Sequence, residues 1–287
     1  MRKIRIFVAL ALCALLANSC DLFKLDNYDG PDAQIEGRLL DSKTGEKVGV
    51  EASYSQEVDW NNVDWTNWVF PMIISSKGTL LVNELGWKDN DGNEVVEDQR
   101  WFVRFDGHYR NDLVFAATYR VIMKELPCYE ISDDEFTVNK GANKKDFEVT
   151  PFCRILEPSV TYNETTKKFE AKFKVELGDP AKANTIQNVM FCANTQLFVG
   201  ANYFNLAKDD ALAKKSTGLA ENTEITLQID PADPKNAELF KYNRTRYFRI
   251  GAQAGGNDYN GNALYNFSPI YEVSADFQTI TEHVWSE

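Results

Sequence analysis

Residues Phe169-Glu-Ala-Lys-Phe-Lys-Val-Glu-Leu177 alternate apolar and polar or charged side chains almost without interruption. A period of two places alternate side chains on opposite faces of a β-strand, so this stretch predicts a strand with one buried face. The upstream segment Ser159–Tyr162 has the same character, and residues 163–168 between the two are polar turn formers. Together they predict a β-hairpin, which places this part of the chain in the all-β class.

The same signals continue to the C-terminus. We expect central strands at 189–193 and 196–199, and an alternating strand at 224–230 that ends before Pro231 and Pro234. Residues 246–252 and 267–273 resemble the closing strand pair of a fibronectin type III or immunoglobulin-like domain. We therefore assign residues 152–287 to one β-sandwich of that type.

The segment upstream of this domain also predicts strands at short intervals. Residues 34–41 alternate and lead into a Thr44-Gly45 turn, and further strands are expected at 101–105, 114–123, 136–138 and 146–150. No convincing amphipathic helix interrupts them. Residues 33–151 are therefore expected to form a β-sandwich of their own.

Two motifs in this first sandwich resemble a known family. The pattern Ile35-x-Gly37-x-Leu39-x-Asp41-x-x-Thr44-Gly45 is similar to the first hairpin of transthyretin-like, carboxypeptidase-regulatory-type domains. Residues 106–109, 113–115 and 117–121 resemble their second landmark. The resemblance implies that the chain is all-β, with a transthyretin-like sandwich followed by a fibronectin-like one.

The N-terminus has the features of an export signal. Arg2, Lys3 and Arg5 precede an apolar run at 6–17, which is too short to span a bilayer as a helix. The sequence Leu16-Ala17-Asn18-Ser19-Cys20 resembles a bacterial lipobox. This resemblance implies a signal peptide at 1–19, a lipid on Cys20, and attachment to a membrane through that lipid. The alternative is an ordinary secretory signal with an incidental cysteine.

Residues 20–32 are acidic, contain Gly30 and Pro31, and lack periodicity, so we expect a flexible tether. The order of lipobox, transthyretin-like domain and second β-domain is similar to an uncharacterised two-domain lipoprotein family of Bacteroidetes. Genes of that family lie beside starch-utilisation-system-type transporter and glycan-binding lipoprotein genes. The resemblance implies an outer-membrane lipoprotein at the cell surface, with that transporter and its glycan-binding lipoprotein as partners.

Composition excludes several functions. The 43 acidic residues exceed the 31 Lys and Arg, giving a net charge of −12, which disfavours nucleic-acid binding. Only two histidines are present, the five cysteines show no C-x-x-C spacing, and common hydrolase and nucleotide-binding motifs are missing. We expect no enzymatic activity, no catalytic residue and no cofactor, with a glycoside hydrolase as a distant alternative.

Aromatic residues are the strongest candidates for a binding site. Trp60, Trp65 and Trp68 fall within nine residues and alternate with Asp and Asn. Flat indole faces beside hydrogen-bonding groups suit sugar rings, although tryptophan also fills the cores of small sandwiches. Tyr259, in a glycine- and asparagine-rich loop, is a second candidate for glycan binding.

Metal binding is not expected. The acidic stretch 89–98 resembles half of a calcium loop, but Gly92 and Arg100 stand at the wrong positions, and a solvated turn is the better interpretation. The sequence therefore predicts a lipid-anchored accessory protein of glycan utilisation that binds sugar without cleaving it. The alternative is a structural lipoprotein that docks on a transporter complex and binds no sugar.

Overall fold

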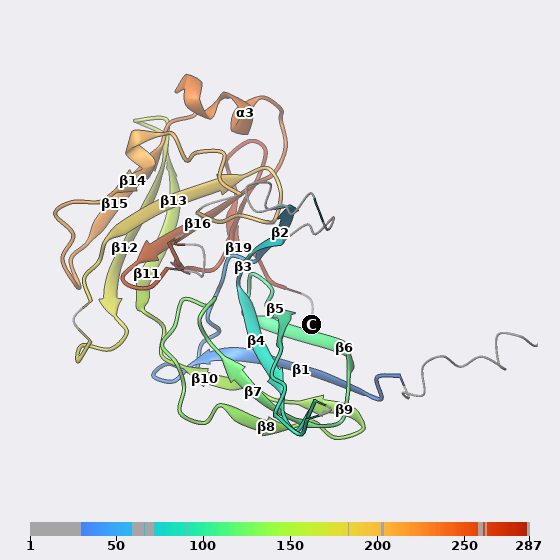
Figure 1. The fold of residues 1–287 in the computed structure, drawn as a ribbon. Coiled ribbons are helices and arrows are strands. Elements are labelled where there is room, and N and C mark those ends of the chain that lie inside the picture. The colour runs from blue at the N-terminus through green and yellow to red at the C-terminus, as the bar shows by residue number, and fades with distance from the viewer. Residues whose placement is uncertain are drawn as a thin grey trace, which may run out of the picture.

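The computed structural model describes residues 30–58, 66, 72–89, 91–182, 184–201, 204–257, 261 and 263–285, with the backbone alone for 53–58 and 72–77. The chain is an all-β sandwich protein, as the sequence predicts. We call residues 33–151 the N-terminal unit and 152–287 the C-terminal unit. Figure 1 shows the two units packed side by side. None of the helices in these described ranges is long and apolar enough to cross a membrane.

The N-terminal unit packs two sheets around one apolar core. Within the described ranges, one sheet has the order β10-β1-β6 with β9 also on β1, and the other has the order β5-β4-β7-β8. Alternate residues of β1, from Ala33 through Leu39, are buried between the sheets. The strand bounds are β1 Ala33–Asp41, β4 Thr79–Glu84, β5 Asp98–Phe102, β6 His108–Val114, β7 Thr118–Ile122, β8 Glu135–Thr137, β9 Gly141–Lys144 and β10 Phe147–Val149.

β1 pairs with three strands from the second half of its unit. It runs antiparallel to β6 and parallel to β9 and β10. Gly37 in the middle of β1 lies so close to the Lys145 carbonyl that a Cβ atom there would be 1.7 Å from its oxygen. The glycine of the sequence motif therefore allows β1 to approach the segment between β9 and β10.

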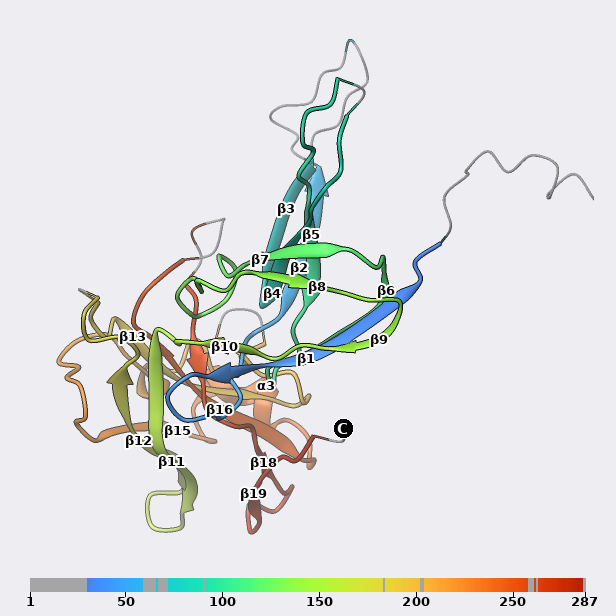
Figure 2. The same cartoon turned by 90° about the horizontal axis from the view of Figure 1, so that it is seen from below.

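A hairpin leaves the body of the N-terminal unit. β2 (Ser53–Val58) and β3 (Met72–Lys77) pair along their whole length, and Figure 2 shows them extending away from the two sandwiches. Gly78, with a φ of +62°, joins β3 to β4, and a Cβ atom there would lie 2.8 Å from the Ala52 Cα. This glycine lets the chain bend where the hairpin meets the sheet.

The C-terminal unit is a second sandwich. Within its described residues the sheets have the orders β11-β12-β15 and β14-β13-β16-β18-β19, with β17 on β16. Phe169, Ala171, Phe173 and Val175 of β12 are buried, which confirms the alternation in the sequence. The bounds are β11 Cys153–Asn163, β12 Lys168–Leu177, β13 Asn188–Asn194, β14 Lys214–Lys215, β15 Ile225–Ile229, β16 Arg246–Gln253, β17 Asn266–Phe267, β18 Tyr271–Val273, β19 Ile280–Glu282, the 3-10 turns Ala211–Ala213 and Pro234–Asn236, and α3 Ala237–Phe240.

One strand prediction is wrong. Residues 196–199 form no strand, and β13 ends at Asn194. The Asn194 side chain accepts hydrogen bonds from the amides of Thr195 and Gln196, and it donates to the Phe198 carbonyl. An asparagine that binds neighbouring backbone groups stabilises a turn instead of a ladder.

Candidate functional site

The site residues predicted from the sequence lie outside the described part of the chain: Cys20, Trp60, Trp65, Trp68 and Tyr259. The three tryptophans belong to the connection between β2 and β3, whose ends Val58 and Met72 are ladder partners. A role for these residues in glycan binding therefore stays a prediction.

The acidic stretch after β4 forms a turn. The Asp89 carboxylate accepts hydrogen bonds from the amides of Asp91 and Asn93 and from the Asn93 side chain, at 2.8–3.0 Å. These bonds lower the pKa of Asp89, with the Asn93 side chain as the largest cause. Both oxygens of Asp89 are thus used by the chain itself. The described residues hold no group of three or more side chains arranged for a metal ion.

Two buried arginines fix the junction between the units. Arg249 of β16 donates to three carbonyl oxygens: Ser268 at 2.9 Å, Val50 at 3.0 Å and Phe105 at 2.6 Å. Two of these carbonyls belong to the N-terminal unit. Burial lowers the pKa of the Arg249 guanidinium to about 9, which leaves it protonated at neutral pH. Its charge is balanced by carbonyl dipoles and by the face of the Phe267 ring, 4.4 Å away.

The second arginine makes a bidentate ion pair across the same junction. Arg154 binds Asp41 through Nε and Nη2, at 2.5 and 2.7 Å, and donates through Nη1 to the Gly178 carbonyl. Burial acts to raise the pKa of Asp41, but hydrogen bonds from Arg154 and from the Lys43 amide outweigh it and leave the pKa lowered. The Asn266 side chain adds a bond to the Pro127 carbonyl at 2.8 Å. The two units are therefore held by directional polar contacts.

An apolar cluster completes the junction. Phe105 of the N-terminal unit packs with Cys192, Val199, Ala201, Tyr265 and Ile270 of the C-terminal unit.

Cys128, Cys153 and Cys192 are buried free thiols, and burial raises the pKa of each. These thiols fill core space as small apolar groups.

A groove of about 530 Å³ opens beside Arg249 where the two units meet. The N-terminal unit contributes Glu46, Lys47, Gly49, Phe105 and Asp106 to its lining. The C-terminal unit contributes residues 267–270 and 282–285, so the groove exists only when the units are packed together. Its volume is within the usual range for small-molecule sites, which often lie at such domain junctions.

The aromatic wall of this groove is Trp285. Its indole is partly exposed. The His283 ring lies perpendicular to it with 5.1 Å between the ring centroids, and the Arg104 guanidinium lies 5.1 Å from the Trp285 ring centroid. His283 is itself oriented by the Glu272 carboxylate, 3.4 Å from Nδ1. Trp285 thus contacts His283 and Arg104 and presents a partly apolar surface to the groove.

The polar wall is centred on Asp106. Its carboxylate lies 3.4 Å from Nε of Arg104 and 3.9 Å from Nζ of Lys47, and it accepts a hydrogen bond from the His108 amide. Glu46 and Glu282 add two further carboxylates to the lining. The indole can contact the C–H face of a sugar. At the same time, the carboxylates and the ammonium or guanidinium donors can contact the hydroxyls of that sugar.

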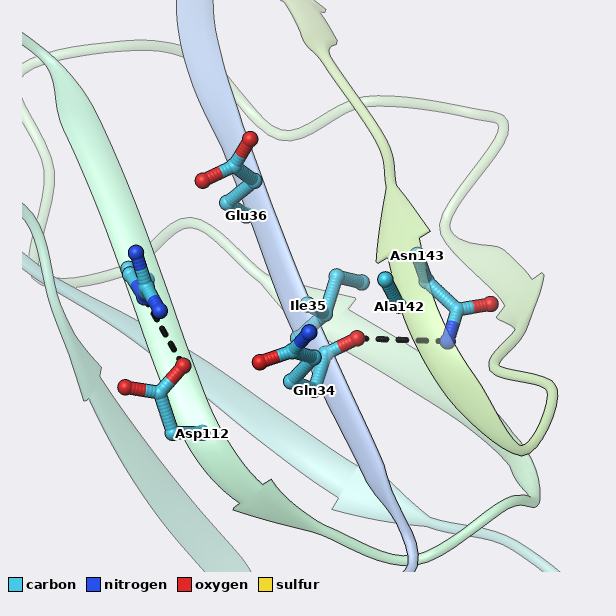
Figure 3. Close-up of a pocket in the computed structure, with 7 residues that line it drawn as sticks. Gln34, Ile35, Glu36, Asp112, Ala142 and Asn143 are labelled. Atoms are coloured by element: carbon cyan, nitrogen blue, oxygen red, sulfur yellow. Dashed lines mark hydrogen bonds and ion pairs between the residues drawn. The ribbon is translucent and has the colours of Figure 1, made fainter. Parts of the chain in front are cut away.

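A second, smaller pocket lies on the sheet formed by β1, β6 and β9. Figure 3 shows Gln34, Ile35, Glu36, Asp112, Ala142 and Asn143 around it. The pocket has a volume of about 130 Å³. The Asn143 amide donates to the carbonyls of Gln34, Asn139 and Gly141, and Asp112 pairs with Arg110 at 2.8 Å. Its lining has no aromatic ring, and its volume is below the usual range for small-molecule sites. The groove is therefore the better candidate site.

Sequence reasoning missed the groove. Trp285 is an isolated tryptophan near the C-terminus, and Asp106 falls in the stretch 106–109, which indicates only the resemblance to transthyretin-like domains. The available signal was the run Glu282-His283-Val284-Trp285, which combines an indole, an imidazole and a carboxylate within four residues.

Comparison with known proteins finds the same fold in solved structures from Bacteroides and Parabacteroides. Neither a protein-family model nor a curated protein matches the sequence. A solved structure named as a candidate carbohydrate-binding protein from Bacteroides uniformis is similar, with a TM-score of 0.62, 29% identity, and coverage of 85% of this chain and 100% of that chain.

Two further solved structures are DUF3823 family proteins. The one from Parabacteroides merdae has a TM-score of 0.56 and 20% identity, and covers 84% of this chain and 98% of its own. The one from Bacteroides ovatus has a TM-score of 0.55 and 18% identity, with coverages of 85% and 99%. The chain has the fold of these proteins. At these identities the likeness concerns architecture, and it extends over both units.

Proposed function

We propose that the protein is a lipid-anchored cell-surface accessory of a glycan-utilisation system, related to the DUF3823 family proteins, and that it binds oligosaccharide or polysaccharide without cleaving it. The similar protein named for carbohydrate binding, at 29% identity over all of its length, supports the sugar-binding part. The lipobox-like sequence at Cys20 supports the anchor.

The observation that carries the proposal is the groove at the junction. It combines the Trp285 indole with the carboxylates of Asp106 and Glu46 and with the Lys47 ammonium. Stacking against an indole contributes favourable contact with the apolar face of a sugar, while charged groups bind its hydroxyls more strongly than neutral ones do. The Arg249 hydrogen bonds join the two units whose surfaces form the groove, so its walls are in place before a ligand binds, which reduces the entropy cost of binding.

Calorimetric titration of the purified protein with a panel of neutral polysaccharides and oligosaccharides tests this function. We expect heat with at least one glycan, and about tenfold weaker binding for Trp285→Ala, equivalent to a loss of about 1.4 kcal/mol. Trp87→Ala is the matched control, because Trp87 is 43% exposed and lies outside the groove. Absence of heat with every glycan would contradict sugar binding, and release of reducing ends would contradict the non-catalytic role.

The tryptophans between β2 and β3 form a second proposed platform. The same titration with Trp60→Ala, Trp65→Ala, Trp68→Ala and Tyr259→Ala separates this platform from the groove. Weaker binding in these variants, with Trp285→Ala unchanged, would move the site to the residues predicted from the sequence.

The lipid anchor has its own test. Cys20→Ala is expected to abolish labelling by a fatty-acid probe and to release the protein from the membrane fraction, because the thioether lipid supplies the membrane affinity. Cys13→Ala, which removes a cysteine inside the apolar run, should leave labelling intact. Labelling that persists in Cys20→Ala would refute the anchor.

The alternative function is a rigid spacer that docks on an outer-membrane transporter and binds no sugar. The Arg249 and Arg154 contacts favour this alternative, because they fix the two sandwiches in one orientation. Co-purification with a transporter complex, together with calorimetric silence against the glycan panel, would select this alternative.

A further inference from the structure

A third pocket, of about 420 Å³, lies at the edge of the C-terminal sheet beside β14. Lys214 and Lys215 form this short strand, which pairs with Met190 and Val189 of β13. Asp210 begins the preceding 3-10 turn by accepting a hydrogen bond from the Leu212 amide at 2.8 Å. The turn and the short strand together hold both lysines at the pocket.

The charge of this pocket is opposite to that of the molecule. Lys214 and Lys215 are its charged lining groups, whereas the whole chain carries −12. Within the described residues neither ammonium group forms an ion pair with a carboxylate; Lys214 donates only to the Lys208 carbonyl, at 3.3 Å. The carboxylate nearest in sequence, Asp210, is buried and bonded instead to the Asn236 side chain at 2.7 Å.

The remaining lining residues can contact a sugar. Ser216 and Thr217 are exposed and supply hydroxyl donors, and Met190 and Tyr265 supply apolar surface. The pKa of Tyr265 is raised to about 12, mainly by burial. Its hydroxyl is therefore protonated at neutral pH and can donate a hydrogen bond. Cations, hydroxyl donors and an aromatic ring around one cavity match a sugar ring that carries an anionic substituent.

We propose that the pocket beside β14 binds the carboxylate or sulfate group of an acidic sugar residue, with Lys214 and Lys215 as its cationic partners. This inference rests on the proposed glycan-binding function and specifies one charge class of glycan. The net negative charge of the chain does not prevent such binding, because exposed charges are screened beyond about 8 Å at physiological ionic strength. The two lysines next to the ligand then determine the interaction.

The test is calorimetric titration of the full protein with three probes of equal length: an oligogalacturonate, a sulfated oligosaccharide and a neutral oligosaccharide. The two acidic probes distinguish a carboxylate from a sulfate as the preferred group. We expect the double variant Lys214→Gln/Lys215→Gln to bind the acidic probes about tenfold or more weakly, and to bind the neutral probe as before. Binding of the acidic probes should also weaken as salt is raised.

Lys172→Gln/Lys235→Gln is the matched control, because it removes the same charge from two exposed lysines of the same unit. Equal affinity of the Lys214/Lys215 variant and the native protein for the acidic probes would overturn the inference. So would binding of the neutral probe without binding of either acidic probe. If no probe binds, the inference fails, and the neutral panel described above then decides whether the proposed function fails as well. Weaker binding of the neutral probe in Trp285→Ala concerns only the groove.

Discussion

At the scale of single residues, the junction depends on side chains that no local pattern identifies. Arg249 falls within a stretch that the sequence correctly predicts as a strand. Its partners Phe105 and Val50 lie 144 and 199 residues away in the chain. A period-two pattern predicts which face of a strand is buried, but it does not show that a buried arginine will meet three carbonyl oxygens from two units.

Asp41 provides a prediction about pH. Its pKa is lowered in the folded protein, so it adds stability above its unfolded value of about 3.9, and this stability is lost as the pH falls through the folded pKa. We expect Asp41→Asn to reduce the free energy of unfolding by about 3 kcal/mol at pH 7. We also expect it to remove part of the decline in stability below pH 4. Urea unfolding followed by circular dichroism between pH 7 and pH 2.5 measures both effects.

The control for Asp41→Asn is Asp112→Asn. Asp112 pairs with Arg110, but both side chains are more than half exposed, so little change is expected. Parallel pH profiles for the native protein and Asp41→Asn would show that the ion pair with Arg154 does not contribute in this way.

At the scale of elements, the sequence predicts strands well where alternation is strict and poorly where side chains bind the backbone. β12 is confirmed because one complete set of its side chains is buried. The strand expected at 196–199 is absent because Asn194 stabilises a turn. No local pattern predicts the parallel pairing of β1 with β9 and β10, because the paired residues are more than 100 positions apart in the chain.

The bend between β3 and β4 gives a prediction about Gly78. Gly78 and Gly45 both have positive φ values, but a Cβ atom at Gly45 would meet nothing within 4 Å, whereas one at Gly78 would be 2.8 Å from backbone atoms of Glu51 and Ala52. Gly45→Ala should cost about 1 kcal/mol for the left-handed conformation alone. Gly78→Ala should cost at least about 1 kcal/mol more, because the backbone must also move. Chemical denaturation of the two variants measures the difference, and equal costs would mean that the bend relaxes freely.

At the scale of the whole molecule, the arginine contacts and the apolar cluster make the two units dependent on one another. We expect differential scanning calorimetry to show one cooperative transition, with equal calorimetric and van't Hoff enthalpies. Arg249→Met should lower stability by about 3 kcal/mol, because buried carbonyl oxygens of both units lose their donor. Two separate transitions in the native protein would contradict this dependence.

Arg244→Met is the control for this variant, because Arg244 is exposed and its side chain makes no contact with the N-terminal unit in the described residues. A change within about 0.5 kcal/mol is expected there. If Arg249→Met were equally mild, the apolar cluster around Phe105 would be sufficient to join the units.

The candidate site is also a property of the whole molecule, which explains why it could not be read from the sequence. The groove takes Glu46, Lys47 and Asp106 from one unit and Trp285 from the other. These residues share no motif and no fixed spacing, because the packing of two sandwiches brings them together. Sequence reasoning instead selected Trp60, Trp65, Trp68 and Tyr259, since clustering along the chain is the signal that a sequence offers.

The pairing of β1 determines when the protein can fold during synthesis. β1 begins at Ala33, close behind the proposed lipid-bearing Cys20, yet its parallel neighbours β9 and β10 end at Lys144 and Val149. The N-terminal sheet therefore stays incomplete until about half of the chain has been synthesised. Contacts of such long sequence separation give folding times of milliseconds to seconds. Chaperones would thus meet β1 as an unpaired strand before its sheet can close.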